Sequence, residues 1–284
     1  MQFTPLTIDD REAIPHGTLQ IFELEMRPYP DARRRRIRVW LPEEYNGVTR
    51  FPVLYMHDGQ ALFRGEDDRT KWDCDRTVTA LAGEGLACII VGIDSAETRG
   101  EELTPPYPLS GRAMVNGQPL PFVAMERTSD TYAEFVVSCL KPLIDANYCT
   151  LPDPAHTGIG GASAGGSQSY YMALRNPEVF GRALICSPGF PLLDIEAILA
   201  ELDGYDMTRL AGSRFYFYNG DQMIDATSVD DVLAVYRRLR QRGLDASQNM
   251  FLFDSREGHY DAAWARIFPD ALRWLFAEDN LRRP

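Results

Sequence analysis

A short run of small residues in the middle of the chain could hold a reactive serine. Gly161, Ala162, Ser163, Ala164 and Gly165 form a Gly-x-Ser-x-Gly pattern. In such a turn the chain passes so sharply from a strand into a helix that only small side chains fit two residues before and two residues after the serine. A helix starting near Ala164 directs its N-terminal amides and the positive end of its dipole at the serine. The pattern therefore indicates nucleophilic attack by a hydroxyl through an anionic intermediate.

A serine hydroxyl needs a base to accept its proton, and the chain has four histidines. His16 precedes the first expected strand, and His156 opens the strand that leads to Ser163, roughly 20 Å away at the rise of a strand. His57 ends an earlier strand, where we expect it to order a loop by hydrogen bonding. His259 follows the last expected strand and precedes the last helix, the place of the base in folds that use this turn. We therefore expect Ser163 as nucleophile and His259 as base.

The acid that orients the histidine should lie between these two residues in the chain, on the loop after the strand expected at 214–218. That loop reads Asn-Gly-Asp-Gln-Met-Ile-Asp and offers Asp221 and Asp225. Asp221 follows directly after the strand and its glycine, and we prefer it. Asp225 is the alternative acid, or it caps the helix that starts nearby. Both choices give the order Ser, Asp, His.

Two backbone amides are the candidates for binding the developing oxyanion. One belongs to Gln60, in the loop after the strand at 52–56, and the other to Ala164, directly after the candidate nucleophile. Donors at these two positions would lie on either side of the reacting carbonyl oxygen.

These residues fall on a regular alternation of short apolar runs and amphipathic helical patterns from residue 51 onward. This order is typical of a mostly parallel sheet covered by helices on both faces. Two earlier segments read as an antiparallel lead-in, which makes eight strands. The expected strands are Leu19–Met26, Arg36–Leu41, Pro52–Met56, Ala87–Ile93, His156–Ala162, Arg182–Cys186, Arg214–Tyr218 and Met250–Phe253. Apolar residues at helical spacing predict helices over about 132–144, 229–239 and 264–275.

One stretch, residues 94–129, breaks this alternation. It contains five prolines and follows the carboxyl end of a strand, the side of an open α/β sheet where ligands bind. We interpret it as a candidate lid or substrate-shaping insertion; a surface excursion without a catalytic role is the alternative. No linker or repeat divides the chain, so we expect one domain over residues 1–284.

Composition restricts the partners. Acidic residues outnumber basic ones by 41 to 29, and a net charge of −12 argues against a nucleic-acid partner. The one basic run, Arg33 to Arg36, lies in a strand-like segment, and we expect it on a solvated face. No apolar run suits a signal or a membrane span, which favours a soluble, cytoplasmic protein without a membrane partner. An exposed first strand would allow pairing into a homodimer, and the oligomeric state stays open.

Other chemistries lack their motifs. The chain has no His-Glu-x-x-His and no closely spaced Cys/His set, so we expect no metal. The glycines near Ser163 come late in the chain for a dinucleotide fingerprint, so we expect no cofactor.

The chain resembles the Putative esterase family of α/β-hydrolases. The resemblance rests on segments that keep their order along nearly the whole chain: Pro15-His16-Gly17, Val39-Trp40-Leu41-Pro42, Tyr55 to Gln60, Leu140 to Ile144, Gly161 to Gly166, Ser187 to Phe190, and Gly258-His259 followed by Trp264. The family includes enterochelin esterases, S-formylglutathione hydrolases, feruloyl and acetyl-xylan esterases, and mycolyltransferases.

The resemblance implies an α/β-hydrolase fold and assigns roles to individual residues. It matches Ser163 and His259 to the nucleophile and base, and Gln60 and Ala164 to the oxyanion amides. Relatives commonly carry a carboxylate three residues after the glycine that matches Gly220, where this chain has Met223.

The sequence thus predicts a serine hydrolase of carboxylic esters that acts on a small-molecule ester through an acyl-enzyme. One alternative is an acyltransferase with the same triad. The other is an inactive binding module on the same fold.

Overall fold

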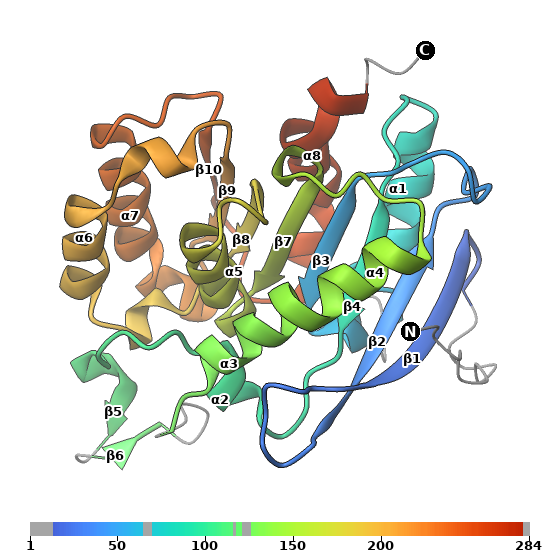
Figure 1. Ribbon diagram of the computed structural model, residues 1–284. Helices are drawn as coiled ribbons and strands as arrows, with labels where there is room; N and C mark the ends of the chain where they lie inside the picture. The colour runs from blue at the N-terminus through green and yellow to red at the C-terminus, as the bar shows by residue number, and fades with distance from the viewer. Residues whose placement is uncertain (1–13, 65–69, 116–117, 121–125, 281–284) are drawn as a thin grey trace.

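A single eight-stranded sheet forms the centre of the computed structural model, which describes residues 14–64, 70–115, 118–120 and 126–280 (Figure 1). The strand order is β1-β2-β4-β3-β7-β8-β9-β10. The strands are β1 (Thr18–Glu25), β2 (Arg34–Leu41), β3 (Val53–His57), β4 (Ile89–Ile93), β7 (Thr157–Ala162), β8 (Arg182–Cys186), β9 (Arg214–Gly220) and β10 (Asn249–Asp254). β5 (Met114–Val115) and β6 (Gln118–Pro119) form a separate two-stranded sheet.

The eight predicted strands are all present, and the antiparallel lead-in is confirmed. β1 pairs with β2 and β2 with β4 in antiparallel fashion, whereas every pairing from β4 to β10 is parallel. Because β7, β8, β9 and β10 run in the same direction, their carboxyl ends meet at one edge of the sheet. The loops that carry the candidate serine, acid and histidine all leave from that edge.

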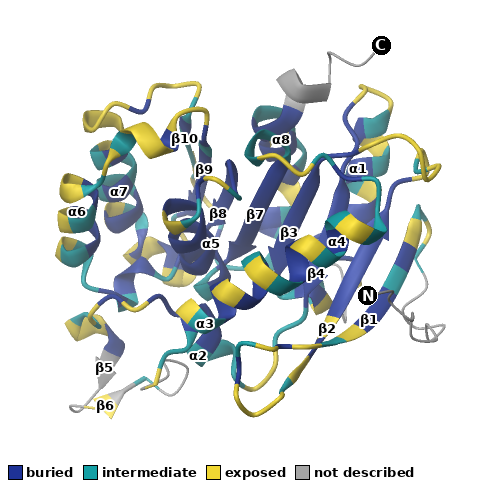
Figure 2. Ribbon diagram, in the orientation of Figure 1, coloured by how far each residue is buried: buried dark blue, intermediate teal, exposed yellow. Residues whose placement is uncertain are grey.

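Helices cover both faces of this sheet (Figures 1 and 2). They are α1 (Cys74–Ala82), α2 (Arg99–Leu103), α3 (Ser129–Glu134), α4 (Lys141–Asn147), α5 (Ala164–Arg175), α6 (Ile195–Gly204), α7 (Val229–Gln241) and α8 (Asp261–Asn280). A π-helical turn at Phe135–Leu140 joins α3 to α4. The predicted helices over 132–144, 229–239 and 264–275 therefore lie within longer helical segments.

Two hydrophobic cores result, one on each face. β3 shows the alternation that separates them, because Val53 and Tyr55 pack into one core and Leu54 and Met56 into the other. α3 to α7 contribute to the first core, and α1 and α8 to the second. Figure 2 shows the strands buried between these layers and the outer faces of the helices exposed.

The expectation for the basic run Arg33 to Arg36 is wrong in part. Arg35 is 3% exposed and donates to both carboxylate oxygens of Glu102 on α2, at 2.7 and 2.9 Å. Arg34 and Arg36 keep exposed positions. The strand alternation holds, since Arg34 and Arg36 lie on the exposed side and Arg35 on the other side. What the sequence did not indicate is that α2 covers this other side and supplies a buried carboxylate.

Contacts with the rest of the fold hold the described residues of the stretch 94–129. Its described residues include α2, the 3₁₀ turn at Gly111–Ala113 and the β5–β6 hairpin. Ser110 donates its backbone N–H to Leu192 O at 3.0 Å, and Asp194 donates to Pro108 O at 2.7 Å, which ties this stretch to the loop after β8. It forms a wall beside that loop; movement as a lid stays a prediction.

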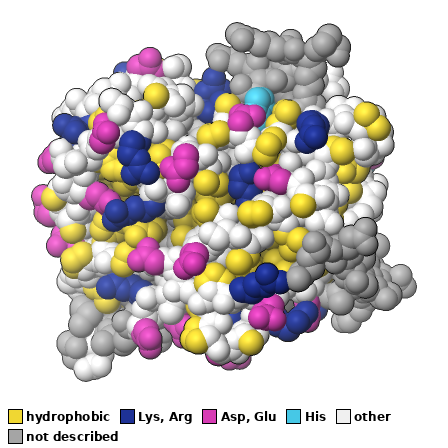
Figure 3. All heavy atoms as spheres, viewed as in Figure 1, with side chains coloured by type: hydrophobic (Ala, Val, Ile, Leu, Met, Phe, Trp, Pro, Cys, Tyr) yellow, Lys and Arg dark blue, Asp and Glu magenta, His cyan; other side chains and the backbone are white. Residues whose placement is uncertain are grey.

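The surface mixes both signs of charge. On the face in Figure 3, Lys and Arg side chains lie among Asp and Glu side chains. β1 is an edge strand of the sheet, as the homodimer hypothesis requires, and that hypothesis and the single domain over 1–284 stay predictions. None of the helices within the described part of the chain is both long enough and apolar enough to cross a membrane.

Candidate active site

Ser163 occupies the turn between β7 and α5 in a strained backbone conformation. Its φ is 58° and its ψ is −126°, a region that residues with a side chain rarely adopt. A Cβ added to Gly161 would lie 3.0 Å from the backbone carbon of Gly165. The two glycines therefore allow the sharp turn that the sequence pattern predicts, and the turn lifts Ser163 above the carboxyl end of β7.

His259 lies in the loop between β10 and α8 and bonds to a buried carboxylate. Its Nδ1 is 2.7 Å from Oδ1 of Asp225, which is only 1% exposed. The other oxygen of Asp225 accepts from the Ser187 hydroxyl at 2.7 Å and from the Gly220 amide at 3.1 Å. With Nδ1–H donating to Asp225, Nε2 of His259 remains as the proton acceptor.

Our preference for Asp221 as the partner of the histidine is wrong in this structure. Its Oδ1 accepts from the backbone N–H of Arg256 and from the side-chain amide of Gln222, both at 2.7 Å. The hydrogen bond from Gln222, with that from Arg256, lowers the pKa of Asp221. These contacts hold Asp221 on the outer turn, whereas the alternative, Asp225, bonds to His259.

The loop conformation explains this exchange. Met223 has a φ of 58°, and a 3₁₀ turn over Met223–Thr227 brings Asp225 back to the end of β9. Ser228, rather than Asp225, is the residue at the N-cap of α7. Closeness to the strand in the sequence therefore did not identify the carboxylate that bonds to His259, because the loop turns back after it leaves the strand.

Ser163 and His259 line one cavity of about 360 Å³ at the carboxyl edge of the sheet. Ala164 and Asp225 also line this cavity. Among the described residues no hydrogen bond joins the Ser163 hydroxyl to His259. In enzymes without substrate, such bonds are often long and tighten only when substrate binds.

The two candidate oxyanion amides lie at separate turns. Ala164 is the first residue of α5, and Gln60 lies in the 3₁₀ turn after β3. Within the described residues neither amide donates to another group of the protein. The Gln60 side chain is fixed at two points by Ser95, whose hydroxyl accepts at 2.7 Å and whose amide donates at 3.0 Å. A Cβ on Gly59 would lie 2.7 Å from the backbone of Gly92, so the turn presses closely on β4.

His57 packs beneath the serine turn. It is 2% exposed, and its Nδ1 is 2.8 Å from the hydroxyl of Tyr132. Burial lowers the pKa of His57 from 6.5 to about 4, so the ring is neutral at physiological pH. A Cβ on Gly161 would lie 3.1 Å from the His57 ring. The contacts agree with the loop-ordering role that we expected.

Ser187 and Trp264 support Asp225 and were not identified from the sequence as site residues. The indole N–H of Trp264 donates to the Ser187 hydroxyl at 2.9 Å, and that hydroxyl donates to Asp225. The Trp264 ring also packs at a right angle to His259, with centroids 5.1 Å apart. Their only sequence signal was membership of the segments that carry the family resemblance.

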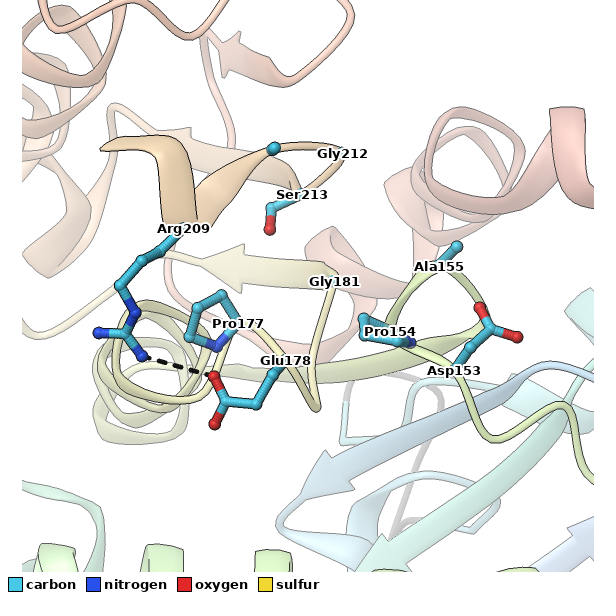
Figure 4. Close-up of a pocket in the computed structure, with 10 residues that line it drawn as sticks. Asp153, Pro154, Ala155, Pro177, Glu178, Gly181, Arg209, Gly212 and Ser213 are labelled. Atoms are coloured by element: carbon cyan, nitrogen blue, oxygen red, sulfur yellow. Dashed lines mark hydrogen bonds and ion pairs between the residues drawn. The ribbon is translucent and has the colours of Figure 1, made fainter. Parts of the chain in front are cut away.

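A second hollow lies at the opposite edge of the sheet (Figure 4). It has a volume of about 460 Å³ and is lined by residues from the turns that precede β7, β8 and β9. Arg209 and Glu178 form an ion pair on its wall at 3.4 Å. Among the described residues, its lining contains no histidine or cysteine. The cavity with Ser163 is therefore the candidate active site. In the described part of the chain, no group of three or more His, Cys, Asp or Glu side chains could hold a metal ion.

The comparisons with known proteins agree with this fold. The model of the family described as "Putative esterase" matches residues 32–274. The uncharacterized protein YbbA of Bacillus subtilis is 24% identical over 260 residues, which cover 88% of this chain and 95% of that protein. A protein described as endo-1,4-beta-xylanase/feruloyl esterase, from Xylanibacter ruminicola, is 26% identical over 176 residues, 60% of this chain but only 22% of that protein.

A solved structure described as enterobactin hydrolase IroE in complex with DFP has a TM-score of 0.68 at 15% identity. The match covers 93% of this chain and 97% of that one. This similarity shows a common fold. The chain belongs to the Putative esterase family and is a carboxylic ester hydrolase with the α/β-hydrolase fold.

Proposed function

We propose that the protein is a serine hydrolase in which Ser163, His259 and Asp225 form the catalytic triad and an acyl-enzyme is the intermediate. The observation that carries this proposal is the buried bond between His259 and Asp225, in a cavity shared with a serine on a strained turn. The sequence-based choice of nucleophile and base is kept, and the acid is Asp225.

In the first half of the reaction Nε2 of His259 takes the proton of the Ser163 hydroxyl while its oxygen attacks the ester carbonyl. Asp225 holds the imidazole in the required tautomer and stabilises the imidazolium that forms. The tetrahedral intermediate collapses when His259 returns the proton to the leaving alcohol. Water then attacks the acyl carbon of the acyl-enzyme while His259 takes its proton. The second tetrahedral intermediate releases the carboxylic acid as His259 returns the proton to the oxygen of Ser163.

The amides of Ala164 and Gln60 bind the oxyanion in both halves of this reaction. Two observations support this role: Ala164 is the first residue of α5, and the side chain of Gln60 is bonded at two points to Ser95. Amides fixed in this way stabilise the transition state more than the ground state, because charge develops on the oxygen only during attack.

The direct test is chemical labelling together with substitution. A fluorophosphonate probe should label the wild type at Ser163, and Ser163→Ala should lose labelling and lower ester hydrolysis by several orders of magnitude with the fold intact. Labelling at another residue, or full activity in Ser163→Ala, would refute the nucleophile.

The acid has its own matched pair of variants. Asp225→Asn leaves the shape of the site but places an amide against His259, and we expect kcat to fall by about 10⁴. Asp221→Asn is the control from the same loop. Because the carboxylate of Asp221 is exposed, we expect kcat of this variant to stay within about threefold of the wild type. A large loss in Asp221→Asn with a small one in Asp225→Asn would overturn our assignment.

The substrate is a small-molecule ester in this proposal. A panel of siderophore, feruloyl, acetyl-sugar and formyl-thiol esters, measured on the wild type and on Ser163→Ala, would identify the acyl and alcohol groups. Addition of competing alcohols to the same assay separates hydrolysis from acyl transfer, since transfer yields a new ester.

A further inference from the structure

The wall of the active-site cavity combines apolar side chains with two guanidinium groups. Its apolar part comes from Leu120, Pro188, Pro191, Leu192 and Ile224, and its cationic part from Arg99 and Arg112. Both arginines belong to the stretch 94–129. Two guanidinium groups in the active-site wall are unexpected in a chain of net charge −12.

Each arginine is held from behind by a carboxylate that does not line the cavity. Arg99 donates from Nε and Nη2 to the two oxygens of Asp58, at 2.7 and 2.9 Å. Arg112 donates from Nη2 to Asp231 at 2.5 Å and from Nη1 to the carbonyl of Thr227 at 3.0 Å. These bonds fix the planes of both guanidinium groups. The two side chains therefore lose less conformational entropy when a ligand binds.

Donors remain on both guanidinium groups after these bonds. Within the described residues Nη1 of Arg99 has no partner, and neither has Nε of Arg112. Their side chains keep 37% and 47% of their exposure. A planar group with two acceptor oxygens is what free guanidinium donors bind best.

The other charges near the cavity leave room for an added anion. Among the described residues that line it, Asp225 carries the one carboxylate, and that carboxylate is bonded to His259. Asp261 lies near Arg99 and His259, and burial raises its pKa, which disfavours its negative charge. Asp58 and Asp231 face the arginines from the far side. The surface that a ligand meets is therefore richer in donors with positive charge than in acceptors.

We propose that this cavity selects esters that carry a free carboxylate on an apolar acyl or alcohol group, with Arg99 and Arg112 binding the carboxylate. The inference rests on the proposed function, because it assigns the substrate class to the same site. The apolar wall contacts the body of the substrate, and the guanidinium donors bind its charged end.

The test compares esters that differ only in charge. In one series the charge is on the acyl group: 4-nitrophenyl hydrogen glutarate is compared with the 4-nitrophenyl ester of the same length whose acyl group ends in a primary amide. In the other series the charge is on the alcohol: the butyrate ester of 4-hydroxyphenylacetate is compared with the butyrate ester of 4-hydroxyphenylacetamide. We expect kcat/KM for the carboxylate form to exceed that of the amide form by about tenfold in one series, because a charge-assisted bond is stronger than a neutral one.

Variants then assign this preference to the arginines. Arg112→Gln should reduce the ratio of the two kcat/KM values to near one, and Arg99→Lys, which keeps the charge beside Asp58, should reduce it in part. Arg273→Gln is the matched control, since Arg273 is 42% exposed and pairs with Glu84 outside the cavity. Added salt should also reduce the ratio, because both arginines are partly exposed.

Equal hydrolysis of both members in both series, or an unchanged ratio in Arg112→Gln and Arg99→Lys, would overturn the proposal while the serine-hydrolase function stands. If none of these esters is cleaved, a binding measurement tests the proposal instead. Glutarate should raise the Tm of the wild type but not that of Arg112→Gln. Glutaramide should raise the Tm of neither protein. No rise with glutarate would overturn the proposal. Absence of labelling at Ser163 would instead contradict the proposed function.

Discussion

Replacing Ser187 by alanine tests whether the support of Asp225 contributes to catalysis. The Ser187 hydroxyl is 1% exposed and joins the indole N–H of Trp264 to the carboxylate of Asp225. Its removal leaves that carboxylate with two bonds, from Gly220 and from His259. The acid is then free to turn away from the imidazole during the reaction.

The magnitude follows from these contacts. A hydrogen bond to a charged group contributes about 1.5–3 kcal/mol, and burial at this site prevents water from replacing it. If about half of this acts in the transition state, kcat falls by roughly three- to tenfold. The Trp264 N–H is also left buried without its acceptor, so the free energy of unfolding should fall by about 2–4 kcal/mol in total.

The assay is a double-mutant cycle with Ser187→Ala and Trp264→Phe, measured by steady-state kinetics and by denaturant unfolding. Trp264→Phe keeps an aromatic ring near His259 but removes the donor to Ser187. In the Ser187→Ala background the indole N–H already lacks its partner, so the second substitution should cost about 1 kcal/mol less than it does alone. We expect kcat to fall with KM nearly unchanged, because the Ser187 hydroxyl is occupied by its bonds to Trp264 and Asp225.

Two results would refute this reasoning. One is a loss of stability in Ser187→Ala with wild-type kcat, which would give Ser187 a structural role alone. The other is additive effects of Ser187→Ala and Trp264→Phe, which would mean that the two side chains act independently.

Three further variants test other parts of the structure. Gln60→Ala keeps the proposed oxyanion amide but removes its two bonds to Ser95, so kcat should fall by roughly tenfold with little change in KM; wild-type kcat would contradict the positioning role. The wild type should lose about 3 kcal/mol of its free energy of unfolding as pH falls from about 6.5 to about 4, because His57, at 2% exposure, resists the proton that the unfolded chain accepts. His57→Gln should remove this loss, and unfolding curves at several pH values measure it. Asp75→Asn should stabilise the protein at neutral pH, since burial raises the pKa of Asp75, and the gain should shrink as pH falls through that raised pKa; a gain that is constant with pH would exclude the carboxylate as its cause.

The sequence predicted the parts of the fold that local patterns determine. The strands of the parallel sheet read as short apolar runs because both of their faces are buried, and Gly161 and Gly165 marked the turn at Ser163 because a side chain there would collide. α1 and α6 were not predicted. α1 has only nine residues, so its apolar pattern is short, and it packs against α8.

Contacts between distant segments could not be predicted in this way. Arg35 is buried because Glu102, 67 residues later, meets it inside the protein. The alternation of β2 indicates which face Arg35 belongs to, but not that a helix with a carboxylate covers that face. Ser187 supports Asp225 for a similar reason, since 38 residues separate them and no local spacing relates them.

The choice between Asp221 and Asp225 depends on how two loops meet. Both Asp221 and Gln222 donate their backbone N–H to the carbonyl of Glu257, each at 2.9 Å, and a Cβ on Gly220 would lie 2.2 Å from that same oxygen. The first residues after β9 are thus occupied in holding the loop that carries the histidine. The carboxylate that orients the histidine must come from further along, after the chain has turned back. The residues directly after the strand are held by the backbone of the histidine loop, so an aspartate among them cannot also bond to the imidazole. The aspartate that comes first in the sequence, Asp221, is therefore kept out of the site by the same contact that positions the histidine loop.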